Sequence, residues 1–148
     1  MERKEELTVG LRRTTVLPTV MHWRAEAIRQ RWGMAPPARL MVATRQYYRT
    51  HLADGSHMAY IASVGGEDCG YGALEFYDVL PSPDNPAGRR ACVADVYVRE
   101  EFSGRGLEKA ITERLVEEAR SHACGKVTIA TELFPGYGIG SETSPSVF

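Results

Sequence analysis

The sequence predicts an α+β fold in which a mixed, mostly antiparallel sheet is flanked by helices. A strand-like segment near the start of the chain is followed by two stretches with the apolar spacing of helices. Two β-type segments separated by a Gly-Gly turn then indicate an antiparallel hairpin. A third β-type segment, a glycine-containing turn, a helix and a last strand complete the order. The helical connection predicts that the last two strands are parallel.

The first half of the chain predicts one strand and two helices. Leu7–Leu11 forms the strand, and Gly33 ends the helix that follows it. Pro37 precedes a second helix, which ends near Gly55. The apolar residues of both helices have helical spacing: Leu17, Val20, Met21, Trp23, Ala27 and Ile28 in the first, and Leu40, Met41, Ala43, Tyr47 and Tyr48 in the second. The two adjacent tyrosines fit either the core or a ligand contact.

The middle of the chain predicts a hairpin followed by a loop. His57–Val64 is one strand and Cys69–Val79 is its partner, with a Gly-Gly turn between them. Gly70 and Gly72 lie inside the second strand, where glycine indicates a bulge or a neighbour that approaches closely. Residues 81–88 are rich in proline and cannot continue a strand, so they form a loop.

The composition limits the kinds of protein to which this chain can belong. The 148 residues are 43% hydrophobic and 25% charged, which is typical of one soluble globular domain. We expect this domain to span residues 1–131, and residues 132–148 to form an irregular tail. A net charge of -1 without a basic block argues against nucleic acid or an anionic membrane as a partner. The charged start and three scattered cysteines predict a cytoplasmic protein with no signal peptide, membrane span, disulfide framework or metal site.

The segment most informative about function is a strand followed by a turn and the start of a helix. Ala91–Val98 is the strand, and Gly104 and Gly106 lie in the turn. The helix that follows has one apolar face, made of Leu107, Ala110, Ile111, Leu115, Ala119 and Ala123. Backbone N–H groups at such a helix start converge on one point, which suits a phosphate group. A tight turn without a ligand is the plain alternative.

The stretch Val96–Ile111 resembles the GNAT superfamily of N-acetyltransferases. In that family a hydrophobic strand end leads, at the spacing found here, into Arg/Gln-x-x-Gly-x-Gly/Ala and a helix. The corresponding residues are Ser103-Gly104-Arg105-Gly106-Leu107-Glu108. The order of elements over Leu7–Thr131 is also similar to that of the family. The resemblance implies an αβα fold, acetyl-CoA as co-substrate, and transfer of its acetyl group to a primary amine of a small molecule or peptide.

The resemblance also implies which residues bind acetyl-CoA. Backbone groups at the strand end would pair with the pantetheine arm as an added strand does, and one N–H there would polarise the thioester carbonyl. These strand residues are Val96, Tyr97 and Val98. Backbone N–H groups of the turn and the helix start would bind the pyrophosphate. The residues concerned are Ser103, Gly104, Arg105, Gly106, Leu107, Glu108 and Lys109.

Two positions of the turn depart from the family pattern. Ser103 stands where the pattern has Arg or Gln, and Glu108 stands where it has Gly or Ala. The carboxylate of Glu108 adds bulk and like charge beside a pyrophosphate. Residues 132–148 also do not match the helix with a tyrosine and the two strands that continue the family fold. An alternative is therefore a catalytically impaired GNAT-like binding or structural domain with weak or no CoA affinity.

The sequence also bears on catalysis, on other ligands and on assembly. An amine acceptor must lose a proton, and Asp95 and Glu75 are the strand carboxylates best placed to take it, although each also fits the polar side of its strand. A dinucleotide site is disfavoured because Lys109 occupies the place of its third glycine. The strand at Lys126–Thr131 would have an open edge if no strand follows it, which predicts a homo-oligomer.

Overall fold

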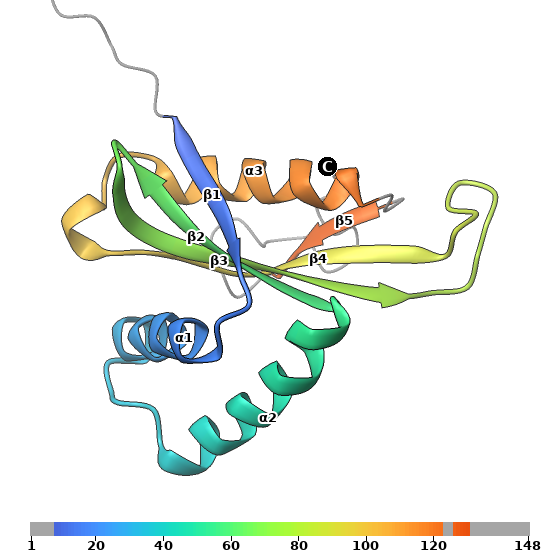
Figure 1. Ribbon diagram of the computed structural model, residues 1–148. Helices are drawn as coiled ribbons and strands as arrows, with labels where there is room; N and C mark the ends of the chain where they lie inside the picture. Colours follow the sequence, from blue (N-terminus) through green and yellow to red (C-terminus); the bar gives the residue numbers. More distant parts are fainter. Residues whose placement is uncertain (1–7, 123–125, 131–148) are drawn as a thin grey trace, which may run out of the picture.

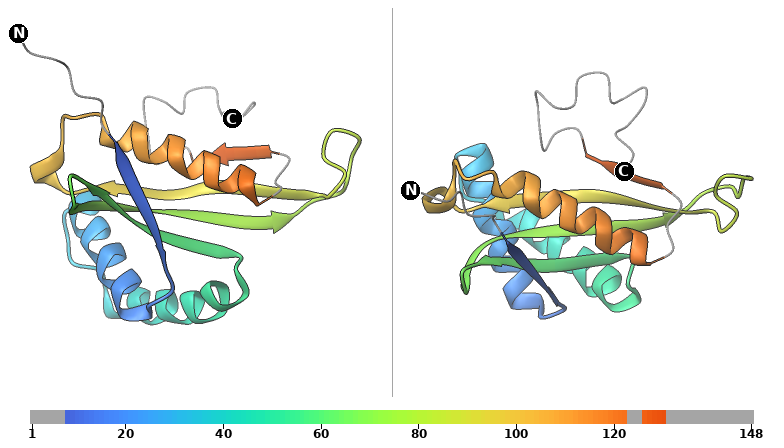
Figure 2. Two further views of the ribbon diagram at one scale, coloured as in Figure 1. Left: turned by 45° about the horizontal axis from the view of Figure 1, so that its top comes forward. Right: turned by 90° about the horizontal axis from the view of Figure 1, so that it is seen from above.

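The structure, a computed structural model, describes residues 8–122 and 126–130. These residues form three layers (Figure 1). Helix α3 (Leu107–Ser121) covers one face of the sheet, and helices α1 (Leu17–Trp32) and α2 (Ala38–Asp54) cover the other. Figure 2 shows the same separation of the helices from two further sides. The predicted α+β class is confirmed.

The sheet follows the chain from strand to neighbouring strand. Its order is β1-β2-β3-β4-β5, with antiparallel neighbours except for the parallel pair β4–β5. The strands are β1 (Val9–Thr14), β2 (His57–Val64), β3 (Glu67–Asp78), β4 (Arg89–Val98) and β5 (Lys126–Ile129). The β2–β3 turn has positive φ angles of 60° and 84° at Gly65 and Gly66, as two-residue hairpin turns require. The predicted hairpin and the predicted parallel pair are both present.

The first strand lies later in the chain than the sequence predicted. It ends at Thr14 and not at Leu11, because its pairing with β2 runs from Val9–Val64 to Thr14–Ala59. Arg12 stays within the strand, where its guanidinium donates two hydrogen bonds to Asp68, at 2.8 and 3.0 Å. A polar residue on the open side of an edge strand does not end the strand. The prediction that this strand ends at Leu11, before Arg12, was therefore wrong.

The two glycines of β3 allow β4 and α3 to pack closely against this strand. A Cβ atom at Gly70 would lie 2.1 Å from the carbonyl oxygen of Tyr97. A Cβ atom at Gly72 would lie 2.6 Å from Cδ1 of Leu115, on α3. The expected close approach is confirmed at both positions. The β2–β3 register also shifts between Ala62 and Ser63, beside Gly70.

The core is unequal on the two faces of the sheet. Between the sheet and α3 it is continuous, and its fully buried side chains include Leu74, Val93, Leu107, Ile111 and Leu115. The face toward α1 and α2 has two smaller clusters, one around Val20 and Tyr48 and one around Trp23 and Tyr71. Aromatic and polar groups therefore meet on the α1–α2 face.

Some predictions fall outside the described residues or stay untested. Residues 131–148 are outside the described part, and so are the proposed domain boundary and the expected irregular tail. Among the described residues, β5 pairs only with β4, and the predicted self-association stays a prediction. None of the described helices is both long enough and apolar enough to cross a membrane.

Candidate functional site

Strand β4 separates from β5 at a bulge. Ala73 pairs with Asp95, and the next pair joins Leu74 to Val93, so Ala94 is an extra residue on β4. The β4–β5 register stops at Val93 with Ile129, and the carbonyl of Val93 accepts a last bond from the Ala130 N–H at 3.1 Å. Among the described residues, no strand pairs with residues 94–98 on that side. The end of β4 that has this free edge leads toward the turn that precedes α3 (Figure 1).

The direction of the backbone groups on this free edge follows from the β3–β4 register. The Arg99 N–H donates to the Cys69 carbonyl at 2.9 Å, so Arg99 and Tyr97 face β3. Val96 and Val98 therefore direct their N–H and C=O groups away from β3. The Val96 carbonyl accepts a bond from the Arg31 guanidinium at 3.1 Å. Of the three strand residues predicted to bind pantetheine, two thus have backbone groups on the free edge.

The glycine turn leads directly into α3. Gly104 and Gly106 have positive φ angles of 79° and 75°, and a Cβ on either would meet nothing within 4 Å. The glycines are needed for backbone conformation and not for space. Leu107 begins the helix, and the Ala110 N–H makes the first intrahelical bond, to the Gly106 carbonyl at 3.2 Å. The preceding N–H groups of this first turn have no carbonyl partner within the helix.

The predicted pyrophosphate-binding residues are thus brought together. Residues 103–106 are exposed, Leu107 is buried in the core, and Glu108 is half-buried in the first turn. The Arg105 guanidinium lies over the Phe102 ring, 5.3 Å from its centroid. Lys109 points to solvent and approaches Glu113 at 3.9 Å. The geometry suits an anion, but it includes one carboxylate, that of Glu108.

A cavity of about 260 Å³ lies on the α1–α2 face of the sheet, beside the bulge. Its lining comes from five elements, namely α1, α2, β2, β3 and β4, and the residue from β2 is His57. Both carboxylates predicted from the sequence, Glu75 and Asp95, line it. Ala94, the extra residue of the bulge, lines it as well. The bulge therefore brings the free edge of β4 and this cavity together.

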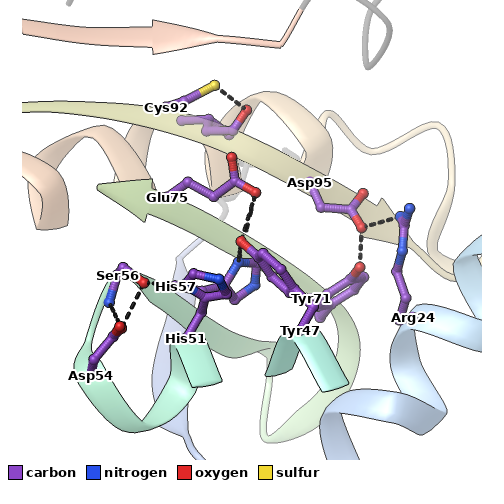
Figure 3. Close-up of polar contacts among 11 residues, drawn as sticks. Arg24, Tyr47, His51, Asp54, Ser56, His57, Tyr71, Glu75, Cys92 and Asp95 are labelled. Atoms are coloured by element: carbon purple, nitrogen blue, oxygen red, sulfur yellow. Dashed lines mark hydrogen bonds and ion pairs between the residues drawn. The ribbon is translucent and has the colours of Figure 1, made fainter. Parts of the chain in front are cut away.

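The carboxylate of Asp95 is buried and held from several sides. Arg24 donates to Oδ2 at 2.6 Å and Arg31 donates to Oδ1 at 3.2 Å. The Tyr71 hydroxyl also donates to Oδ2. Figure 3 shows Arg24 and Tyr71 converging on this group. Two arginines thus compensate one buried carboxylate, an arrangement that fixes α1 against the sheet.

The carboxylate of Glu75 has a different environment. Its side chain is 43% exposed, and the Tyr47 hydroxyl donates to Oε2 at 3.0 Å (Figure 3). The same hydroxyl lies 3.1 Å from Nδ1 of His57. Because Tyr47 has one proton and donates it to the carboxylate, His57 must donate through Nδ1–H. A chain of hydrogen bonds therefore runs from the buried His57 to the open Glu75.

Burial fixes the charge states in this chain. It lowers the pKa of His57 to about 4, so this imidazole is neutral at pH 7 and its 3.9 Å approach to Glu75 is not an ion pair there. Burial and the neighbouring Glu75 raise the pKa of Tyr47, so the phenol keeps its proton. At neutral pH, the carboxylate of Glu75 therefore accepts a hydrogen bond at the open end of this chain, and the two donors in the chain, His57 and Tyr47, are uncharged.

The sequence indicated part of this site and missed the rest. Tyr47 and Tyr48, which fit either the core or a ligand contact by sequence, both line the cavity, and Tyr48 is also part of the buried core. Arg24 and His57 were not singled out. A signal for Arg24 was present, because this charge stands beside Trp23 in an otherwise apolar helix face. His57 looked like an ordinary strand residue.

The described residues contain no group of three or more His, Cys, Asp or Glu side chains arranged to hold a metal ion.

Residues 17–134 match the family model of the Acetyltransferase (GNAT) family. A predicted acetyltransferase with acetyl-CoA from Clostridium acetobutylicum has a TM-score of 0.71 and 20% identity, over 90% of this chain and 88% of that chain. A GCN5-related N-acetyltransferase from Ralstonia eutropha JMP134 has a TM-score of 0.67 and 20% identity, over 94% and 93%. The aminoglycoside N-acetyltransferase AAC(6')-Iy in complex with CoA has a TM-score of 0.61 and 14% identity, over 96% and 88%. No curated protein matches the chain.

Proposed function

Because the chain belongs to the GNAT acetyltransferase family, we propose that it transfers an acetyl group from acetyl-CoA to a primary amine of a small molecule or peptide. The observation that carries this proposal is the bulge at Ala94. It joins a free strand edge, suited to an extended acyl carrier, to a cavity containing an open carboxylate. Similar structures were solved with acetyl-CoA and with CoA, which supports the choice of donor.

Acetyl-CoA would bind along β4 and at the start of α3. The pantetheine arm would hydrogen-bond to Val96 and Val98 as an added strand does. Its pyrophosphate would accept bonds from the N–H groups of the Gly104–Lys109 segment, where the helix dipole favours negative charge. The thioester would then lie near the bulge, where a backbone N–H of β4 can stabilise the oxyanion of the tetrahedral intermediate.

We assign the role of general base to Glu75, with Asp95 as a positioning residue. Both oxygens of Asp95 already accept bonds from arginine or tyrosine, which leaves little capacity for a substrate proton. Glu75 accepts one side-chain bond and is open to the cavity. The acceptor ammonium would give one proton to Glu75, its nitrogen would attack the thioester carbonyl, and CoA would leave as the thiol with the second proton.

A second candidate function is a GNAT-like domain that binds acetyl-CoA weakly or not at all. The observation that favours it is Glu108, half-buried in the first turn of α3, where its carboxylate would approach the pyrophosphate. Ser103 also lacks the long donor found at that position in the family pattern. Such a domain would keep the fold without the activity.

Two measurements test the proposal. Saturating acetyl-CoA should raise the thermal unfolding temperature, since a ligand at 100 times its Kd adds about 2.7 kcal/mol to stability. The variant Glu75→Gln should lose on the order of 100-fold or more in kcat while keeping the wild-type thermal shift. The matched control is Glu113→Gln, an exposed glutamate of α3 that should retain full activity. No shift with millimolar acetyl-CoA favours the second candidate, and an active Glu75→Gln variant excludes Glu75 as base.

A further inference from the structure

A second cavity, of about 330 Å³, opens between the end of α1 and the start of α2. It is lined by Arg24, Ile28, Trp32, Met34, Pro37 and Leu40. Three of these apolar side chains are exposed, with Trp32 at 56%, Met34 at 54% and Leu40 at 41%. A soluble domain seldom gathers large exposed apolar groups around one hollow unless something apolar binds there.

This apolar cavity adjoins the cavity at Glu75. Arg24 lines both cavities, and its guanidinium is held by Asp95 at the boundary between them. On α1 the lining residues Arg24, Ile28 and Trp32 are spaced four apart, on one face of the helix. On α2 the lining residues Leu40, Thr44 and Tyr47 share a face in the same way. The two cavities therefore adjoin at Arg24 along the same two helices, and together they are called the trough, which is polar at the Glu75 end and apolar at the other.

The length of the trough follows from helix geometry. Leu40, at the apolar end, and Tyr47, beside Glu75, are both on α2. Seven residues of helix at 1.5 Å each separate the two ends by about 10 Å. A ligand that reaches both ends must therefore be elongated.

Charge at the polar end selects the sign of the ligand. Among the side chains that line this end, the carboxylate of Asp95 pairs with the guanidinium of Arg24 at 2.6 Å, and Arg31 contacts the other carboxylate oxygen from outside the lining. Glu75 has only neutral donors beside it at pH 7, since His57 is uncharged. Glu75 is therefore the carboxylate of this lining that has no charged partner beside it, and it favours an ammonium group.

We propose that the trough is the acceptor site for an elongated primary amine, with the ammonium at Glu75 and an apolar group about 10 Å away, among Trp32, Met34 and Leu40. This inference rests on the proposed function and names its substrate class. The apolar group is of the size of a phenyl ring or a branched alkyl chain. It belongs either to a small arylalkyl or alkyl amine or to a side chain near the N-terminus of a short peptide.

A panel of matched amines tests the inference and separates the two sources. One arm is a series of ω-phenylalkylamines from phenylethylamine to phenylhexylamine. The other is a set of tripeptide amides that differ only by Ala or Phe at the third position. Release of CoA thiol gives kcat/KM for each. We expect the members that reach the apolar end to be preferred by about 10- to 100-fold, mainly through a lower KM. Equal values across both arms overturn the proposal.

Two variants locate the apolar contact. Trp32→Ala should reduce the preference for long over short amines to less than about threefold. Val42→Ala is the matched control, because Val42 is also exposed, at 52%, but does not line the trough. It should keep both the wild-type preference and the wild-type rate. A Trp32→Ala enzyme that keeps the full preference places the apolar group elsewhere and overturns the proposal.

A binding measurement separates this inference from the proposed function. The chain has two tryptophans, of which Trp23 is buried and Trp32 is exposed. Phenylhexylamine should shift the emission of Trp32 to shorter wavelength even without acetyl-CoA, and the signal should vanish in Trp32→Phe. If no amine is acetylated while this shift occurs, the proposed function fails, and the trough stands as a binding site for the amine only. If amines are acetylated without the shift, the trough fails and the proposed function stands. If neither occurs, both fail.

Discussion

At the scale of single residues, Glu75 and Asp95 illustrate how environment decides the use of a carboxylate. They line the same cavity and come from neighbouring strands. Asp95 is 5% exposed and held by two arginines and a tyrosine, whereas Glu75 is open and receives a hydroxyl from Tyr47. The carboxylate of Asp95 thus attaches helix α1 to the sheet, whereas the carboxylate of Glu75 is open to a substrate.

The hydroxyl of Tyr47 should support catalysis through its hydrogen bond to Glu75. Tyr47→Phe removes the group that donates to Oε2 of Glu75 at 3.0 Å, so kcat/KM should fall by about 5- to 10-fold at pH 7. Tyr77→Phe, on the exposed part of β3, is the control and should keep the wild-type kcat/KM. An unchanged kcat/KM in Tyr47→Phe would show that Tyr47 only fills space.

The buried His57 should make stability depend on pH. Its folded-state pKa of about 4 lies below the unfolded value of 6.5, so the unfolded chain binds more protons between these limits. The free energy of unfolding is therefore highest above pH 6.5 and falls as the pH drops toward 4, by on the order of 3 kcal/mol. Denaturant unfolding across this range should show a flatter slope in His57→Gln than in the wild type. His22→Gln, at an exposed position, controls for loss of a histidine.

At the scale of elements, the sequence indicates those features whose cause is local. The Gly-Gly turn, the ends of α1 and α2 at Gly33 and Gly55, and the start of α3 all depend on residues beside them, and all were predicted. The bulge at Ala94 was not predicted, because it is set by the register of β4 on β3 and has no glycine of its own. The contacts of Arg24 and Arg31 with Asp95 join positions more than 60 residues apart, and spacing along the chain contains no sign of them.

The attachment of β3 to β4 should depend on the missing side chain at Gly70. Gly70→Ala would place a methyl group 2.1 Å from the backbone carbonyl oxygen of Tyr97, which cannot move without breaking the ladder. We expect a loss of about 2–4 kcal/mol in the free energy of unfolding. Gly10→Ala is the control, since its nearest atom is the Ser63 hydroxyl at 3.1 Å, which can rotate away. Equal stability of the two variants in urea would contradict the close approach.

At the scale of the whole molecule, the two faces of the sheet have different roles. The α3 face has the continuous core, and the N-terminus of α3 forms the proposed anion site at one end of the sheet (Figure 2). The α1–α2 face has the smaller clusters and both cavities. The bulge in β4 is where the two regions meet, since Ala94 lines the cavity and Val96 has its backbone groups on the free edge. Donor and acceptor would therefore approach the same point from different sides of the sheet.

A substitution in the first turn of α3 tests whether this helix start binds acetyl-CoA. The stability of the free protein and its affinity for acetyl-CoA should change in opposite directions. Glu108→Gly removes a negative charge beside the proposed pyrophosphate, so acetyl-CoA should bind at least about 10-fold more tightly. Glycine also destabilises a helix by about 1 kcal/mol, so the unfolding temperature of the free protein should fall. Glu113→Gly, an exposed position of the same helix, is the matched control and should lower stability without tightening binding. Calorimetric titration at two salt concentrations checks the electrostatic cause, because the gain in affinity should shrink at high salt. An unchanged Kd in Glu108→Gly would show that the pyrophosphate does not lie at this helix start.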